Sequence, residues 1–169
     1  MLTVRSRTDH DLDACMDVLQ HVYDTSGYPV QGTSKARDFL SKGFIQNAWV
    51  AVHDDKVIGH VALSAPDDSD VSVALWRATY PEQPMIAVLG RLFVDPRHTR
   101  GGAATQLLQA VEEWSRQTNT RLVLFALDKD QAAMRLYRRQ QWVEFGTVPY
   151  RYGQDKEMDA VCFASPLLV

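Results

Sequence analysis

The order of apolar and polar residues along the chain predicts alternating strands and helices. Runs of apolar and β-branched residues indicate strands, and apolar residues at steps of three and four indicate amphipathic helices. The expected strands cover residues 2–5, 49–52, 57–63, 86–94, 122–127, 142–148 and 158–163. The expected helices cover residues 8–23, 33–40, 71–79, 104–114 and 130–140. This order predicts a single α/β (α+β) domain, residues 1–169, with a mixed sheet and helices on both faces.

Two strands have unusual patterns. The strand at 86–94 is interrupted by Gly90 and Arg91, and a glycine inside a strand indicates a bulge or a close approach to the backbone. The strand at 122–127 is apolar at every position, which is typical of a strand buried on both faces.

The strand-to-helix turn after Val94 is the strongest candidate for a binding site. Pro96 can end the strand ladder because it has no N–H, and Gly101 and Gly102 directly precede the apolar stripe of a helix. The first N–H groups of a helix lack internal partners, so small residues there let a phosphate reach them. A tight turn that packs helix against strand explains the same residues equally well.

Known phosphate-binding fingerprints do not match this turn. The sequence contains neither GxGxxG nor GxxxxGK[ST]. Instead, Val94-Asp95-Pro96, the loop from Thr99 to Ala104 and the pair Leu107-Leu108 resemble the acyl-CoA-binding segment of the GNAT superfamily of N-acetyltransferases. Thr99 stands where that pattern usually has Gln or Arg.

A second segment resembles the same superfamily. In the stretch from Asp130 to Trp142, the residues Ala133, Leu136 and Tyr137 match the pattern Asn-x-x-Ala-x-x-Leu-Tyr-x-x-x-Gly-Phe. Asp130 replaces the Asn, Gln141 the Gly and Trp142 the Phe. The two segments follow in the right order, and the resemblance covers roughly residues 48–145.

The resemblance implies a GNAT-like, mostly antiparallel central sheet with a splayed strand pair, and acetyl-CoA as cosubstrate. Backbone N–H groups of the loop would hold the pyrophosphate, and the strand end would lie beside the pantetheine arm. The implied cosubstrate-binding residues are Leu92, Phe93, Val94, Thr99, Arg100, Gly101, Gly102, Ala103, Ala104, Thr105, Asp130 and Ala133.

Acetyl transfer to an amine needs a proton for the leaving thiolate and an unprotonated nucleophile, although a lysine-type amine has a pKa of about 10.4. Tyr137 matches the position of the family's acid, and the alternative is a tyrosine that packs on the sheet. The strand 86–94 contains no Asp or Glu. Candidate bases are His60, Glu82 and Glu144, while a water relay or an already neutral amine would also serve; none is preferred.

Composition narrows the function class. The chain is 46% hydrophobic and 23% charged with a net charge of −3, as in an ordinary globular protein without a nucleic-acid-binding face. No signal region and no apolar run of about 20 residues is found, so we expect a cytoplasmic protein without a membrane partner. Cys15 and Cys162 are expected to be reduced core residues, and the histidines lack metal-ligand spacing, so no metal is expected.

Several interpretations stay open. The acceptor can be a small molecule (a polyamine, an amino acid or an antibiotic amine) or a peptide amine, and a homodimer is compatible with the sequence. The acidic residues Asp67, Asp68 and Asp70 could attract a cationic amine or simply form a solvated loop. A non-catalytic acyl-CoA-binding or regulatory domain on the same fold is the main alternative function, and a different nucleotide-binding α/β protein is a weaker one.

Overall fold

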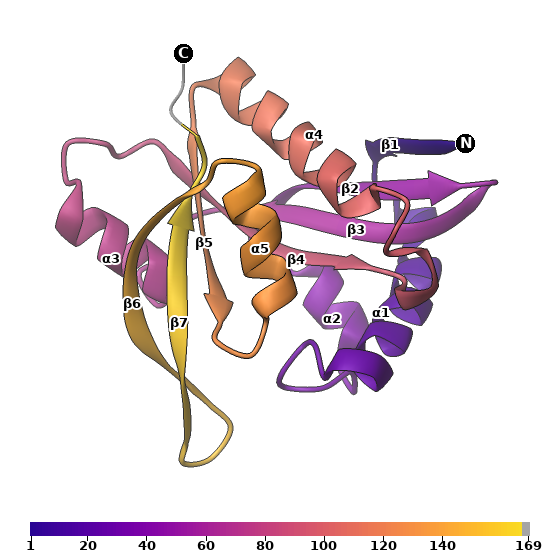
Figure 1. Cartoon of the computed structure of the whole chain (residues 1–169), viewed down its shortest axis with the longest axis horizontal. Helices are drawn as coiled ribbons and strands as arrows, with labels where there is room; N and C mark the ends of the chain where they lie inside the picture. The colour runs from indigo at the N-terminus through magenta and orange to yellow at the C-terminus, as the bar shows by residue number, and fades with distance from the viewer. Residues whose placement is uncertain (167–169) are drawn as a thin grey trace. The chain divides into compact units, whose positions relative to one another are not determined.

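The computed structural model describes residues 1–166 and confirms the order of strands and helices (Figure 1). The strands are β1 Leu2–Ser6, β2 Ile45–His53, β3 Lys56–Ser64, β4 Ile86–Val94, β5 Arg121–Leu127, β6 Val143–Tyr152 and β7 Lys156–Ala164. The α-helices are α1 Leu12–Ser26, α2 Ala36–Ser41, α3 Val71–Thr79, α4 Ala103–Thr118 and α5 Gln131–Arg139. Two 3-10 turns, η1 Asp9–Asp11 and η2 Pro96–His98, precede α1 and α4.

The seven strands form one sheet in the order β1-β2-β3-β4-β5-β7-β6. The pairs β1/β2, β2/β3, β5/β7 and β6/β7 are antiparallel, and β4/β5 is parallel. This mixed, mostly antiparallel sheet is the predicted fold class. The chain divides into two compact units, Met1–Ser64 with Gly90–Val111 and Ala65–Leu89 with the chain from Glu112 onward. The single domain expected from the sequence stays a prediction.

In the first unit, helices cover both faces of the strands. Val50 and Phe93 pack with the buried residues of α1 and α2 in one apolar cluster. On the opposite face, a Cβ placed on Gly59 would lie 3.1 Å from Leu107 of α4. Because successive residues of a strand point to opposite faces, α1 and α2 cover one face and α4 the other.

The second unit has the same layered arrangement. Val73 and Trp76 of α3 form an apolar cluster with Ile86, Val123 and Ala164. The neighbouring residue of β7, Phe163, points the other way and contacts Tyr137 of α5, with ring centroids 5.5 Å apart. Helices α3 and α5 therefore lie on opposite faces of β7.

Some element boundaries differ from the prediction, and local turn chemistry explains why. The first helix starts later than expected, because Thr8 and Asp11 cap the turn η1 before α1 begins. It ends at Gly27, whose φ of 77° is left-handed and whose N–H donates to the Tyr23 carbonyl over 2.8 Å. Strand β6 runs on to Tyr152, beyond the predicted end at 148, because a hairpin with positive φ at Gly153 and Asp155 joins it to β7.

Both cysteines are buried and free, as expected, and burial raises the pKa of each thiol to about 12. None of the helices within residues 1–166 combines the length and apolar character needed to cross a membrane.

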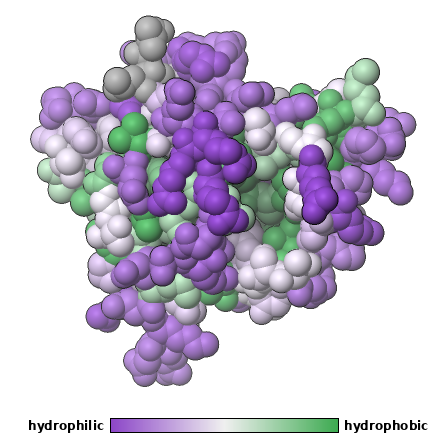
Figure 2. All heavy atoms as spheres, viewed as in Figure 1, coloured by the Kyte–Doolittle hydropathy of each residue, from purple (hydrophilic) through white to green (hydrophobic). Residues whose placement is uncertain are grey.

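Hydrophilic residues predominate on the face shown in Figure 2, with hydrophobic ones visible between them. Among residues 1–166, the exposed large apolar side chains are Met1, Tyr23, Phe44, Met85 and Val143. Phe44 is 46% exposed and contacts a charged side chain of β4, with the Arg91 Cζ atom 5.3 Å from its ring centroid.

Candidate active site

Asp95 fixes the turn that follows β4. Its N–H donates to the Ile58 carbonyl over 2.7 Å, and its Oδ1 accepts from the Arg97 N–H over 2.9 Å. Its Oδ2 accepts from Arg97 Nη2 over 2.8 Å. These hydrogen bonds from Arg97 lower the pKa of the Asp95 carboxyl to about 2, although burial acts in the opposite direction. The carboxylate thereby holds the Pro96–His98 turn in the orientation that leads into α4.

Asp95→Asn should lower the free energy of unfolding by about 1 kcal/mol at pH 7, because a charged cap becomes a neutral one. The folded-state pKa lies below the ordinary 3.8, so the carboxylate stabilises the fold above that value and this contribution disappears as pH falls toward 2. Urea unfolding at pH 7 and pH 3 should therefore show a smaller difference between variant and wild type at pH 3. An equal difference at both values would contradict this role.

The loop between η2 and α4 places two exposed glycines directly before the first N–H groups of α4. Gly101 and Gly102 are exposed, and a Cβ built on Gly102 would meet nothing within 4 Å, while one on Gly101 would only approach the His98 carbonyl at 3.8 Å. The first helical hydrogen bond runs from the Gln106 N–H to the Gly102 carbonyl over 3.0 Å. The N–H groups of residues 102–105 consequently have no acceptor within the helix. This open helix start could hold an anionic group such as a pyrophosphate.

The two glycines have different backbone requirements. Gly102 has a φ of +83°, a left-handed conformation that side chains with a Cβ rarely adopt, whereas Gly101 lies outside that region. A valine at Gly102 would strain the backbone as well as fill the loop. Gly101 is therefore the better position at which to test the loop by substitution.

Strand β4 is paired with its neighbour β5 at three positions. The pairing runs from Ile86 with Arg121 to Val88 with Val123, although β4 continues to Val94 and β5 to Leu127. Arg91 interrupts β4 with a φ of +53°, so the predicted bulge lies at Arg91, directly after Gly90. Of the residues expected to border the cosubstrate, the Phe93 side chain is buried in the core, while Leu92 and Val94 are half-buried.

His60 fixes this bulge from the next strand. It is fully buried, its Nδ1 lies 2.8 Å from the Arg91 carbonyl and its Nε2 lies 3.0 Å from Arg7 Nη1. Because Arg7 can only donate, Nε2 accepts and the Nδ1–H donates to the carbonyl. Burial lowers the pKa of His60 to about 4. Both nitrogens of the neutral ring are occupied, so this arrangement favours a structural histidine over a general base.

Tyr137 lies on the buried side of α5 in the second unit. Its side chain is 5% exposed, and its ring centroid lies 5.7 Å from that of Trp142 and 5.5 Å from that of Phe163. Trp142 is fixed in turn because its Nε1–H donates to Glu112 Oε2 over 3.3 Å. The tyrosine ring is therefore held rigidly, whichever role its hydroxyl has.

The other residues of the second predicted segment lie at the start of α5. Asp130 occupies the position before the helix, as expected, but its side chain makes no capping hydrogen bond. Burial raises the pKa of its carboxyl, and Ala133 is half-buried one turn further on. The loop residues 99–105 belong to the first unit, whereas Asp130, Ala133 and Tyr137 belong to the second.

The remaining candidate bases and the acidic cluster have ordinary surroundings. Glu82 and Glu144 are exposed, and Glu144 pairs with Arg138 over 3.5 Å. Asp68 pairs with Arg77, and Asp70 accepts from the Ser72 N–H over 2.8 Å at the start of α3. Within residues 1–166, no group of acidic, histidine or cysteine side chains could hold a metal ion.

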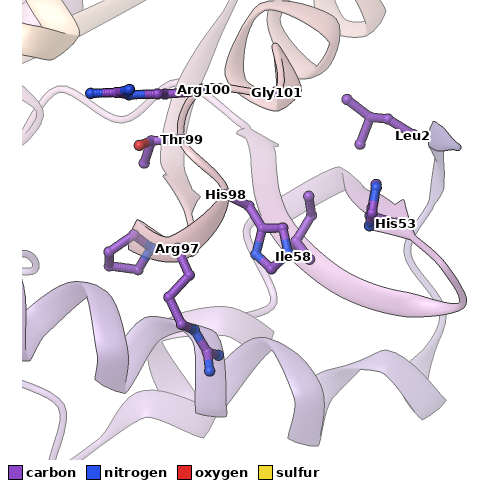
Figure 3. Close-up of a pocket in the computed structure, with 9 residues that line it drawn as sticks. Leu2, His53, Ile58, Arg97, His98, Thr99, Arg100 and Gly101 are labelled. Atoms are coloured by element: carbon purple, nitrogen blue, oxygen red, sulfur yellow. The ribbon is translucent and has the colours of Figure 1, made fainter.

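A hollow of about 510 Å³ adjoins the loop before α4 in the first unit (Figure 3). It is lined by Leu2, His53, Ile58, Pro96, Arg97, His98, Thr99, Arg100 and Gly101. The rings of His53 and His98 lie 5.7 Å apart, and the buried Nδ1 of His98 has no hydrogen-bond partner among the described residues. In Figure 3, Arg100 extends away from both histidines. The hollow thus adjoins the same loop whose N–H groups are open.

Sequence reasoning missed three residues that shape this region: Arg7, Arg91 and Asp95. The signal for Arg91 was present, because a charged residue after a glycine interrupts an apolar strand. Asp95 lies inside the recognised Val-x-Pro pattern at its unspecified position. Arg7 had no signal, because it reaches His60 from 53 positions away in the sequence.

Comparison with known proteins identifies similar sequences and folds. A family model described as the acetyltransferase (GNAT) family matches residues 15–141. The ribosomal-protein-S18-alanine N-acetyltransferase of Escherichia coli has a TM-score of 0.73 at 19% identity, over 100% of this chain and 96% of its own. Arabidopsis thaliana NAA60 in complex with acetyl-CoA has a TM-score of 0.72 at 16% identity, over 99% and 100% of the two chains. No curated protein sequence matches the chain.

Proposed function

The chain belongs to the GNAT family of acetyltransferases, and from this premise we propose that it transfers an acetyl group from acetyl-CoA to a primary amine by direct attack. The observation that carries the proposal is the loop before α4. Gly101 and Gly102 expose the unpartnered N–H groups of a sixteen-residue helix, as an anionic pyrophosphate requires. A neighbour of the same fold whose structure contains acetyl-CoA supports this choice of cosubstrate.

In the proposed reaction, the N–H groups of residues 102–105 bind the pyrophosphate, and the end of β4 borders the thioester. The amine nitrogen attacks the carbonyl carbon, so that a C–N bond forms and the C–S bond breaks. The nitrogen loses a proton to solvent or to a base, and the thiolate takes one from an acid. A β4 N–H would stabilise the negative charge that develops on the carbonyl oxygen.

We assign the acid to Tyr137. The rings of Trp142 and Phe163 hold it in one orientation, which a proton donor needs. Tyr137 belongs to the second unit and the loop to the first. The base stays unassigned, because His60 has both nitrogens occupied and the exposed Glu82 and Glu144 have no special surroundings.

The burial of Tyr137 favours a second candidate, a non-catalytic acyl-CoA-binding domain. A tyrosine that is 5% exposed between two aromatic rings can serve packing alone. Both candidates require the loop to bind acetyl-CoA.

Isothermal titration of the purified protein with acetyl-CoA tests the pyrophosphate-binding loop before α4, which both candidate functions require. We expect one acetyl-CoA site per chain. We also expect weaker binding of the acetyl thioester of pantetheine, which lacks the pyrophosphate. Absence of acetyl-CoA binding would contradict both candidates. Equal affinity for the pantetheine thioester would contradict the role given to the open N–H groups.

A further inference from the structure

Arg91 has an environment that the proposed reaction does not explain. Its Nε–H donates to the Phe39 carbonyl over 2.5 Å, and its Cζ lies 4.5 Å from the Phe39 ring centroid and 5.3 Å from that of Phe44. The residue is half-buried, and this burial lowers the pKa of the guanidinium, which nevertheless stays charged. The planar cation is thus fixed by one hydrogen bond and two aromatic rings.

Within the described part of the chain, no carboxylate pairs with this cation. Other arginines have such a partner, as Arg5 has in Asp11 and Arg97 in Asp95. Among residues 1–166, no ion pair includes Arg91, and its two Nη atoms donate no hydrogen bond to the protein. A half-buried charge without a counter-ion is unfavourable, and a guanidinium presents two parallel N–H donors that match a carboxylate. The free side of the guanidinium is therefore suited to an anion from outside the chain.

The position of Arg91 on β4 indicates which ligand carries that anion. Its partner Phe39 packs against the α1–α2 cluster, and Tyr28 contacts both Phe39 and Phe93 of that cluster. Val94 points the other way, toward the face that α4 covers, because its Cγ2 and Leu107 both border Gly59. The pyrophosphate-binding site that we propose is the start of α4. If acetyl-CoA binds on the α4 side, the side with Arg91 and the α1–α2 cluster is available to the second reactant, the amine.

We infer that the Nη atoms of Arg91 bind a carboxylate of the acceptor, so that the substrate is a primary amine of the amino-acid type. This inference rests on the proposed acetyl transfer. Phe39 and Phe44 hold the guanidinium plane, and the partly exposed Phe44 offers an apolar surface beside the bound carboxylate. The carboxylate can belong to a free amino acid or to an acidic side chain near a peptide N-terminus, and both sources present the same group to Arg91.

The test compares acceptors that differ only in this group. Thiol release from acetyl-CoA is measured with free amino acids, with their α-amides, and with peptide amides whose second residue is aspartate or asparagine. We expect kcat/KM for a carboxylate-bearing amine to exceed that of its matched amide at least 30-fold. Preference among free amino acids, or only among peptides, identifies the source of the carboxylate. An enzyme that acetylates acids and amides equally well would overturn the inference while leaving acetyl transfer intact.

Two variants assign the preference to Arg91. Arg91→Gln should lower kcat/KM for the carboxylate-bearing amine at least 30-fold, change that of the amide less than 3-fold and leave the Kd of acetyl-CoA within 2-fold. Arg91→Lys keeps the charge without the paired donors and should fall between these values. Arg121→Gln is the matched control, because Arg121 also lies over an aromatic ring, that of Trp76, but at the paired end of the β4/β5 ladder. An equal loss for acid and amide in Arg91→Gln would overturn the inference in favour of a structural role.

If no amine is acetylated, the proposed function fails, but the inference can still be tested by binding. The same acids and amides are then titrated into the protein saturated with CoA. A preference for the acid that disappears in Arg91→Gln would support the carboxylate site, and equal binding of acid and amide would overturn it.

Discussion

Replacing Gly101 with valine is expected to weaken acetyl-CoA binding at least 100-fold, a loss of about 2.8 kcal/mol. The side chain would project into the open space in front of the helix start, where a Cβ meets only the His98 carbonyl at 3.8 Å. Charge-assisted hydrogen bonds from the N–H groups of residues 102–105 would then be lost or lengthened. Because Gly101 has no left-handed backbone conformation, the substitution should not strain the fold.

Calorimetric titration of Gly101→Val with acetyl-CoA measures this loss, and thermal unfolding checks the fold. Gly43→Val is the control, because Gly43 also lies in open space outside the left-handed region but far from the loop in sequence. We expect the control to bind acetyl-CoA like the wild type. Unchanged affinity in Gly101→Val would show that the small residues serve only the packing of the turn.

The second large effect is expected for Tyr137→Phe. A positioned general acid typically contributes about 100- to 10,000-fold to the rate, so removal of the hydroxyl should lower kcat by a factor in this range. The ring contacts with Trp142 and Phe163 would be kept, and the Kd of acetyl-CoA should stay within 2-fold. Thiol-release kinetics together with calorimetry separate the two quantities.

Tyr80→Phe is the matched control for Tyr137→Phe. Tyr80 belongs to the same unit and also packs on a tryptophan, with its ring centroid 4.5 Å from that of Trp76. Loss of the Tyr80 hydroxyl should leave kcat unchanged. If Tyr137→Phe turns over as fast as the wild type, Tyr137 has no part in proton transfer, and the packing interpretation of this residue is correct.

Local patterns in the sequence were sufficient to predict most of the fold. The strand at 86–94 and the helix at 71–79 have the predicted bounds, the strand because its apolar run defines it and the helix because the Asp70 side chain caps its first turn. The loop before α4 was also predictable, since glycines before a helical stripe leave its first N–H groups bare. These features depend on neighbours along the chain.

Features that depend on distant residues could not be predicted. The sequence offered His60 as a candidate base but did not reveal that Arg7 and the Arg91 carbonyl occupy its two nitrogens. In the same way, Gly90 indicated a bulge, whereas only the structure shows that the bulge turns Arg91 onto Phe39. The order of the strands also follows from pairing between segments far apart, such as β5 with β7.

The role that we infer for Arg91, binding a carboxylate of the acceptor amine, depends on these long-range contacts. His60 holds the backbone of the bulge by its carbonyl, and Phe39 holds the side chain of Arg91. Both the backbone and the side chain of Arg91, which we infer to bind the acceptor carboxylate, are therefore held in place before any ligand binds. Preorganisation of this kind lowers the cost of ordering the site on binding.

The most direct test of the central claim is to incubate the purified protein with acetyl-CoA and a panel of primary amines, and to follow free thiol together with the acetylated amine. We predict that thiol and acetylated product form in equal amounts, that both require the protein and the amine, and that Tyr137→Phe slows both. Binding of acetyl-CoA without acetylation of any amine in a panel of amino acids, peptides and polyamines would contradict acetyl transfer and favour the binding domain.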